Sequence, residues 1–137
     1  MIFSLYTDGG ARGNPGPAGI GAVIKDGEAV VKKIKKYIGE ATNNQAEYEA
    51  LIFGLSELKK MGGKDLEVNC FLDSELVVKQ LNLEYKVKNK ELAPLFVKVW
   101  NLAQGFKKCK FFHVYREQNK EADKLVNEAL DEREDDN

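Results

Sequence analysis

Three segments within the first forty residues have sequence patterns typical of β-strands. Ile2 to Thr7 form one such segment, and two more, rich in Val, Ile and Ala, span Gly19 to Lys25 and Glu28 to Tyr37. The Asp26-Gly27 pair between the last two predicts a tight antiparallel hairpin. Because the first segment runs into a Gly- and Pro-rich stretch, we expect that strand to end there and to leave Asp8 in a loop.

From Asn43 the apolar residues recur at steps of three and four, which predicts a helix that ends at Gly62-Gly63. Extending its apolar stripe backward places Glu47 on the core side of the first turn. This is an unusual position for a carboxylate, since ionised side chains seldom face a core without a partner. A buried strand is then predicted from Leu66 to Leu72, and Asp73 follows it at the start of a short helix.

The remaining pattern predicts a helix from about Glu91 to Gln104, a last strand from Lys110 to Val114, and a final helix with a core face between Ala122 and Leu130. Asp123 lies in the first turn of that helix. Strands joined through helices should be parallel, and the opening hairpin makes the sheet mixed. We therefore expect an α/β fold, with a five-stranded mixed sheet and helices on both faces.

Length and charge refine this picture. A chain of 137 residues suits one compact domain. The last seven residues carry five acids and one Arg, so residues 1–130 have a net charge of +3 although the whole chain has −1. We assign residues 1–130 to one folded domain and expect 131–137 to be a disordered acidic tail that packs against nothing. The positive balance of the domain permits a polyanionic partner.

Several classes of protein are excluded by what the sequence lacks. No apolar run approaches the roughly 18 to 20 residues that cross a bilayer, and the N-terminus does not have the features of a secretory signal. Cys70 and Cys109 are too few for a disulfide scaffold and have no C-x-x-C spacing. We expect a cytoplasmic protein with buried free thiols, while pairing of the two cysteines across neighbouring strands stays open.

Four carboxylates lie at the ends of predicted elements: Asp8, Glu47, Asp73 and Asp123. If the first and fourth strands pair, Asp8 and Asp73 become neighbours at the carboxyl edge of the sheet, where α/β proteins place functional groups. Clustered acids need raised pKa values or bound cations. Oxygen ligands select Mg²⁺ or Mn²⁺ over zinc, and two such ions suit phosphodiester hydrolysis.

Each acid also has a purely structural interpretation. Glu47 could close a capping box with Asn44, Asp73 could cap the helix after it, and Asp123 could stabilise a helix N-terminus. Asp8 is followed by glycine, a common pair in turns. Any one of these acids alone would more often be structural, and the combination favours a metal site.

The four acids belong to four sequence blocks. These are TDGGARGNPGPAGIG (residues 7–21), TNNQAE (42–47), LDS (72–74) and NKEAD (119–123). Together they resemble, in order and spacing, the signature blocks of type 1 ribonuclease H, over about residues 1–130. The first two blocks are highly specific. The resemblance implies a ribonuclease H-like fold and a catalytic domain that cuts the RNA strand of RNA–DNA hybrids, leaving 5′-phosphate and 3′-hydroxyl ends.

Carried over by position, the resemblance makes Asp8, Glu47, Asp73 and Asp123 the catalytic residues and the ligands of two Mg²⁺ ions, for which Mn²⁺ can substitute. Asp8 would bridge both ions, Glu47 and Asp73 would hold the one that activates water, and Asp123 would complete the second. Nine further positions match family contacts to nucleic acid: Gly9, Gly10, Ala11, Arg12, Asn14, Thr42, Asn43, Asn44 and Arg116. Small amides and glycine backbone suit the shallow minor groove and its 2′-hydroxyls.

The chain departs from many bacterial members in the segment after the third acid. Those members carry a long basic insertion that grips the hybrid, whereas only Leu83 to Lys90 occupies this place. A solvated loop and a small substrate clamp both remain open for its three lysines, Lys86, Lys88 and Lys90.

A second departure concerns histidine. Many members place a mobile His in a loop before the last acid, whereas the one His of this chain, His113, falls on a predicted strand. The segment HVYREQN (113–119) resembles the shorter form of archaeal and some bacterial members. We assign His113 a structural role and expect Arg116 to reach the scissile phosphate.

Two other functions remain open. Another nuclease of the same superfold, such as an integrase or resolvase, is disfavoured because it would not be expected to match the first two blocks together. A non-catalytic hybrid-binding module should have lost at least one of the four acids, and all are present. We therefore predict a monomeric ribonuclease H that acts on RNA–DNA hybrids, with no membrane association and no obligate protein partner.

Overall fold

The computed structural model describes residues 1–135. Its strands are β1 (Ile2–Ala11), β2 (Gly16–Asp26), β3 (Ala29–Ala41), β4 (Glu67–Leu72) and β5 (Lys108–His113). Its α-helices are α1 (Asn43–Met61), α2 (Glu75–Leu81), α3 (Ala93–Gln104) and α4 (Lys120–Asp135). Two 3₁₀ turns, η1 (Gly63–Asp65) and η2 (Arg116–Gln118), precede β4 and α4.

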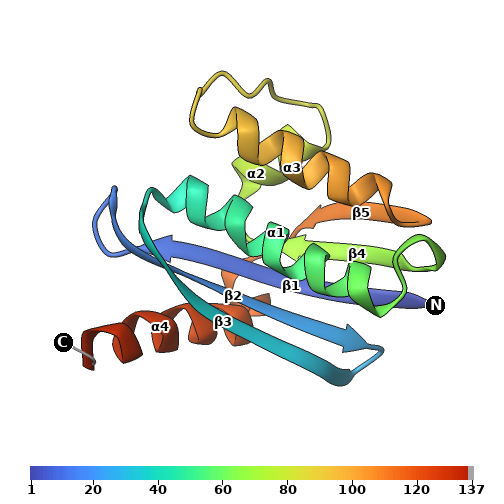
Figure 1. The fold of residues 1–137 in the computed structure, drawn as a ribbon, viewed down its shortest axis with the longest axis horizontal. Helices are drawn as coiled ribbons and strands as arrows, with labels where there is room; N and C mark the ends of the chain where they lie inside the picture. Colours follow the sequence, from blue (N-terminus) through green and yellow to red (C-terminus); the bar gives the residue numbers. More distant parts are fainter. Residues whose placement is uncertain (136–137) are drawn as a thin grey trace.

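The strands form one sheet in the order β3-β2-β1-β4-β5. β2 pairs antiparallel with both β1 and β3, whereas β4 pairs parallel with both β1 and β5. Helices α1, α2 and α3 lie on one side of the sheet and α4 on the other (Figure 1). The expected α/β fold, with a five-stranded mixed sheet and helices on both faces, is confirmed.

β1 is longer than the sequence predicts. Its parallel pairing with β4 ends at Thr7 opposite Leu72, but its antiparallel pairing with β2 continues to Ala11 opposite Ala18. Asp8 is therefore inside the strand, and the expectation of a loop at this position is wrong. The glycines after Asp8 do not end the strand, because β2 supplies hydrogen-bonding partners on one side.

Helix α1 packs closely on β1 and forms the centre of the core. Thr42 caps it in a reciprocal box with Gln45, whose side chain accepts from the Thr42 N–H at 2.8 Å. A Cβ on Gly54 would lie 2.8 Å from the Leu5 side chain, so glycine allows this close approach. We expected Glu47 in the first turn of this helix, but it begins the second turn.

Helix α4 extends past the predicted domain boundary to Asp135. Asp131 pairs with Arg12 at 2.7 Å, Glu132 pairs with Lys35, and the Arg133 guanidinium lies 5.2 Å from the centre of the Tyr37 ring. The expectation of a tail that packs against nothing is therefore wrong for residues 131–133. Residues 136 and 137 lie outside the described part of the chain.

Other boundaries shift by a few residues. α3 begins at Ala93 rather than Glu91, with a proline in its first turn, and β5 begins at Lys108 rather than Lys110. Within residues 1–135, no helix is both long enough and apolar enough to cross a membrane.

Candidate functional site

Three carboxylates converge at the edge of the sheet where β1 and β4 part. Asp8 comes from β1, Asp73 directly follows β4, and Glu47 projects from α1. One oxygen of each lies within 4.8 Å of the other two. The predicted neighbourhood of Asp8 and Asp73 is confirmed, because the parallel pairing ends one residue before each of them.

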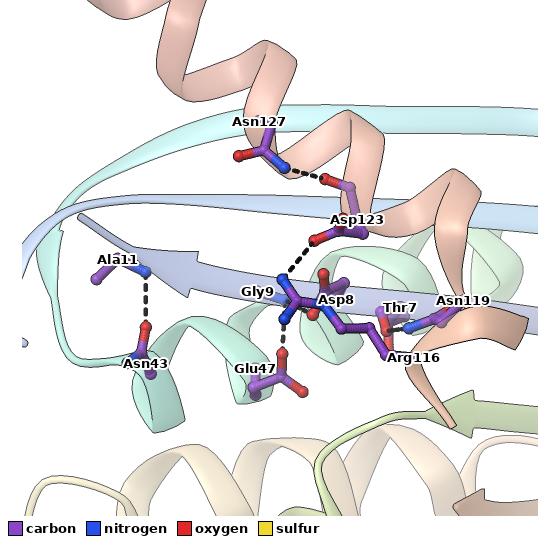
Figure 2. Close-up of polar contacts among 10 residues, drawn as sticks. All are labelled: Thr7, Asp8, Gly9, Ala11, Asn43, Glu47, Arg116, Asn119, Asp123 and Asn127. Carbon is purple, nitrogen blue, oxygen red and sulfur yellow. Dashed lines mark hydrogen bonds and ion pairs between the residues drawn. The ribbon is translucent and has the colours of Figure 1, made fainter. Parts of the chain in front are cut away.

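Glu47 is held in place by the backbone of β1. The Gly9 N–H donates to its Oε1 at 2.7 Å (Figure 2), whereas its Oε2 is buried and has no hydrogen-bond partner among the described residues. Burial raises the pKa of Glu47 well above its usual value, and the nearby Asp8 carboxyl acts in the same direction. A buried carboxylate oxygen without a partner is a suitable ligand for a cation.

The structural interpretations of Glu47 and Asp73 are wrong. The capping box of α1 uses Thr42 and Gln45, not Asn44 and Glu47. Helix α2 is capped by the hydroxyl of Ser74, which accepts from the Val77 N–H at 3.3 Å, so Asp73 does not provide the cap. Both acids are therefore free of a helix-capping role.

Crowding makes the ionised state of this cluster costly. Burial raises the pKa of Asp8 to about 7, and the charges of Asp73 and Asp123 add to the effect. Burial also raises the pKa of Asp73. Each of these shifts reflects a preference for the neutral form that a bound cation would reverse.

The fourth acid, Asp123, lines the same cleft but is not one of the three that approach within 4.8 Å. It faces Asp8 from the first turn of α4, and its Oδ1 lies 3.8 Å from Nη2 of Arg116 (Figure 2). The Arg116 side chain is 81% exposed, so the guanidinium can also reach a ligand in the cleft.

The cleft has a volume of about 560 Å³ and contains most of the predicted substrate contacts. Seven of the nine line it: Gly9, Gly10, Ala11, Arg12, Asn43, Asn44 and Arg116. The other two, Asn14 and Thr42, do not line it, and Thr42 caps α1. Asn14 Oδ1 accepts from the Asn43 N–H at 3.0 Å, and Asn43 Oδ1 accepts from the Ala11 N–H at 2.8 Å.

Sequence reasoning missed several positions at this site. Asn119 is buried and donates to the Thr7 carbonyl at 2.8 Å, which ties the turn before α4 to β1. Asn127 and Tyr115 also line the cleft. Asn127 follows Asp123 by one helical turn, a spacing that could have indicated it. His113 lies on a strand as predicted, is the last residue of β5, and is exposed where it lines the cleft.

Comparison with known proteins extends these observations. A family model described as reverse transcriptase-like matches residues 6–129. The chain is 33% identical to ribonuclease H of Hydrogenovibrio crunogenus, covering 93% of this chain and 94% of that protein. It is 43% identical to ribonuclease HI of Halobacterium salinarum over 93% of this chain. The chain spans 63% of that protein. It is also 45% identical, over 96% of its own length, to the bifunctional protein Rv2228c of Mycobacterium tuberculosis, of which it spans 36%.

Solved structures resemble the whole chain. LC11-RNase H1 in complex with an RNA/DNA hybrid superposes with a TM-score of 0.91 at 48% identity, covering 95% of this chain and 97% of that one. RNase H1 from the archaeon Halobacterium salinarum gives a TM-score of 0.91 at 41% identity, covering 96% and 99%.

Proposed function

The chain belongs to the type 1 ribonuclease H family, and we propose that it is an endonuclease that hydrolyses the RNA strand of RNA–DNA hybrids, leaving 5′-phosphate and 3′-hydroxyl ends. The observation that carries this proposal is the convergence of Asp8, Glu47 and Asp73, with oxygens within 4.8 Å, in a cleft that also contains Asp123 and Arg116. The hybrid bound to LC11-RNase H1, 48% identical to this chain, supports the choice of substrate.

We propose that the four acids hold two Mg²⁺ ions, for which Mn²⁺ can substitute. The site suits a hard divalent cation because its clustered donors are carboxylate oxygens and the buried Oε2 of Glu47 has no other partner. Asp8, Glu47 and Asp73, whose oxygens lie within 4.8 Å of one another, would hold the ions together with Asp123. When bound, the ions activate water for attack and stabilise charge on the scissile phosphate.

The chain's own groups orient the phosphodiester. Arg116 lies beside Asp123, where its guanidinium can neutralise a phosphate oxygen and hold the cut strand in register. The Gly9 N–H fixes Glu47, so the carboxylate oxygens keep their positions when the charge on the phosphate changes. Such fixed groups lower the barrier without having to reorganise during the reaction.

Selection of the RNA strand rests on Asn43 and Asn44, which line the cleft, and on Asn14, which is hydrogen-bonded to Asn43. The side-chain oxygens of Asn14 and Asn43 each accept a backbone N–H, which fixes the amide planes and leaves their NH₂ groups to donate elsewhere. A 2′-hydroxyl accepts such a bond, and DNA has no group at this position.

We further propose that residues 1–130, together with the turns of α4 that continue beyond them, form one catalytic domain. We also propose that the protein acts in the cytoplasm, a reducing compartment that would keep Cys70 and Cys109 as free thiols.

The test is cleavage of an end-labelled RNA–DNA hybrid in Mg²⁺, beside the same sequence as duplex DNA and as single-stranded RNA. We expect cuts in the RNA of the hybrid, products with 3′-hydroxyl ends, and no cutting in EDTA. Asp73→Asn provides the matched inactive control. Equal cutting of duplex DNA would favour another nuclease of the superfold, and hybrid binding without any cutting would favour a non-catalytic module.

A further inference from the structure

The half of the sheet formed by β4 and β5 has one face that no helix of the described chain covers. Helix α4 packs on β2, β3 and β1 and lies away from β4 and β5 (Figure 1). Alternate residues of β4 are partly exposed, and the corresponding residues of β5 are exposed. Parallel strands in α/β proteins are normally buried on both faces, so this open face is unusual.

Three aromatic rings lie in a row across this face, on three adjacent strands. Tyr6 is paired with Phe71 in the β1–β4 register, and Phe71 with Phe112 in the β4–β5 register. The ring centres are 4.9 Å apart for the first pair and 5.5 Å for the second, and both pairs are stacked. We call Tyr6, Phe71 and Phe112 the aromatic row. Phe112 ends it on the edge strand, is 41% exposed, and has no further strand beside it.

Lysines flank the aromatic row on the same face. Lys110 precedes Phe112 by two residues on β5, about 6.6 Å along the strand, and forms no ion pair within the described part of the chain. Lys25 lies at the other end, with its Nζ 5.1 Å from the centre of the Tyr6 ring, and is paired with Glu121 at 2.9 Å. The one acid on β4, Glu67, is already paired with Lys108 at 3.7 Å. The face is therefore aromatic along one row, and the cation beside it that has no ion pair within residues 1–135 is Lys110, near the Phe112 end.

We propose that this face binds single-stranded nucleic acid, with a base stacked on the outer side of the Phe112 ring and the adjoining phosphate at Lys110. Exposed aromatic rings with neighbouring cations are the combination by which sheets hold single strands, because every base offers a stacking face and every nucleotide a negative charge. An apolar protein segment would gain nothing from the unpaired Lys110. This function is separate from the catalytic cleft and does not depend on the proposed nuclease activity.

The direct test is a titration of the ¹⁵N-labelled protein with the oligonucleotide (dT)₈ in EDTA, followed by NMR. A DNA single strand is not cleaved, so binding is observed alone. We expect the largest amide shift changes at residues 69–71 and 110–112 of β4 and β5. Changes confined to the cleft around Gly9 and Asn43, or no binding at all, would overturn the proposal.

Variants make the assignment specific. Phe112→Ala and Lys110→Gln should each weaken (dT)₈ binding by about fivefold or more, as expected for loss of one stacked base or one phosphate contact. Lys59→Gln, an exposed lysine on α1 at the opposite face of the sheet, is the matched control and should bind as the unmodified protein does. Hybrid cleavage at saturating substrate should be unchanged in all three. Unchanged (dT)₈ affinity in both Phe112→Ala and Lys110→Gln, with thermal midpoints showing intact folding, would refute the surface.

Discussion

The backbone N–H of Gly9 donates to Oε1 of Glu47, and this 2.7 Å bond joins the strand that carries Asp8 to the helix that carries the second acid. The contact requires that strand and helix approach closely. A Cβ on Gly9 would lie 2.2 Å from the backbone carbonyl of Ala46 and 2.6 Å from the Glu47 nitrogen. Glycine at this position therefore sets the distance between Asp8 and Glu47, two side chains of the proposed metal site.

Replacing Gly9 with alanine should move α1 away from β1. We expect Gly9→Ala to lower the free energy of unfolding by about 1 to 3 kcal/mol and to abolish most hybrid cleavage, since the new methyl meets backbone that cannot rotate away. Gly10→Ala is the control for stability, because its nearest neighbours would be 3.7 Å and 4.0 Å away. Equal thermal midpoints for the two variants would contradict the close-approach argument.

Asp8→Asn should inactivate the enzyme and stabilise the metal-free protein. The raised pKa of Asp8, about 7 against 3.8, means that ionisation is costly in the folded state. At low pH the Asp8 carboxyl is protonated in both the folded and the unfolded protein, so its ionisation costs no stability there. The cost to the folded state grows as the pH rises toward 7. In EDTA we expect the free energy of unfolding of the variant to exceed that of the unmodified protein by about 1 to 3 kcal/mol near pH 8 and by almost nothing near pH 4.

Chemical denaturation of both proteins across this pH range measures the difference. A gain that is constant with pH would show that Asp8 ionisation is not its source. Near-normal Mg²⁺-dependent turnover by Asp8→Asn would remove Asp8 from the metal site.

Calcium in place of magnesium should separate binding from catalysis. Ca²⁺ is larger and accepts looser coordination, so the cluster of Asp8, Glu47 and Asp73 should still bind a cation and the hybrid, with little hydrolysis. Fluorescence anisotropy with a labelled hybrid gives the affinity, and a gel assay gives the cleavage. Affinity should fall steeply with salt. A flat salt dependence would contradict an interface that follows the phosphate backbone.

The sequence left the pairing of β1 with β4 open, whereas the order of the elements could be predicted from it, because period and turn residues are local signals. The extent of β1 could not. The glycines after Asp8 look like the end of a strand, yet β2 continues to pair with them as far as Ala11. Local propensity does not report a partner that lies further along the chain.

The candidate site shows the same limit. Its four acids could be identified from the sequence blocks, but the roles of their neighbours depend on tertiary contacts. Composition favoured a solvated acidic tail. In the structure α4 continues to Asp135, and Asp131 pairs with Arg12 at 2.7 Å. The bond of Asn119 to the Thr7 carbonyl joins residues far apart in the chain, which no periodicity could have indicated.

The two cysteines should both be free thiols. Their Sγ atoms are 3.9 Å apart on β4 and β5, and burial raises the pKa of Cys70 well above its usual value. The native protein should therefore react with a thiol reagent at the partly buried Cys109 first and at Cys70 slowly. Denatured, unreduced protein should show two reactive thiols per chain. Fewer than two would mean that the pair has been oxidised.

The segment between α2 and α3 contains three lysines that are candidates for binding the DNA strand of the substrate. It arches beyond the ends of both helices (Figure 1) and exposes Lys86, Lys88 and Lys90, while Val87 packs against the core. The partly buried valine anchors the segment to the core, so the three lysines project from an anchored loop. They lie where other family members carry a long basic insertion, and we predict that they contact phosphates of the DNA strand.

Replacing all three lysines with alanine should raise KM and leave kcat nearly unchanged, because such contacts hold the ground and transition states alike. Each lost phosphate contact should reduce the slope of log affinity against log salt by roughly one unit, or about three in all. The matched control replaces Lys59, Lys60 and Lys64, three exposed lysines near the far end of α1, with the same change of charge. If the loop variant and this control shift KM and the salt slope equally, only net charge matters. In that case the loop is a solvated connection, and the DNA strand is held by other residues.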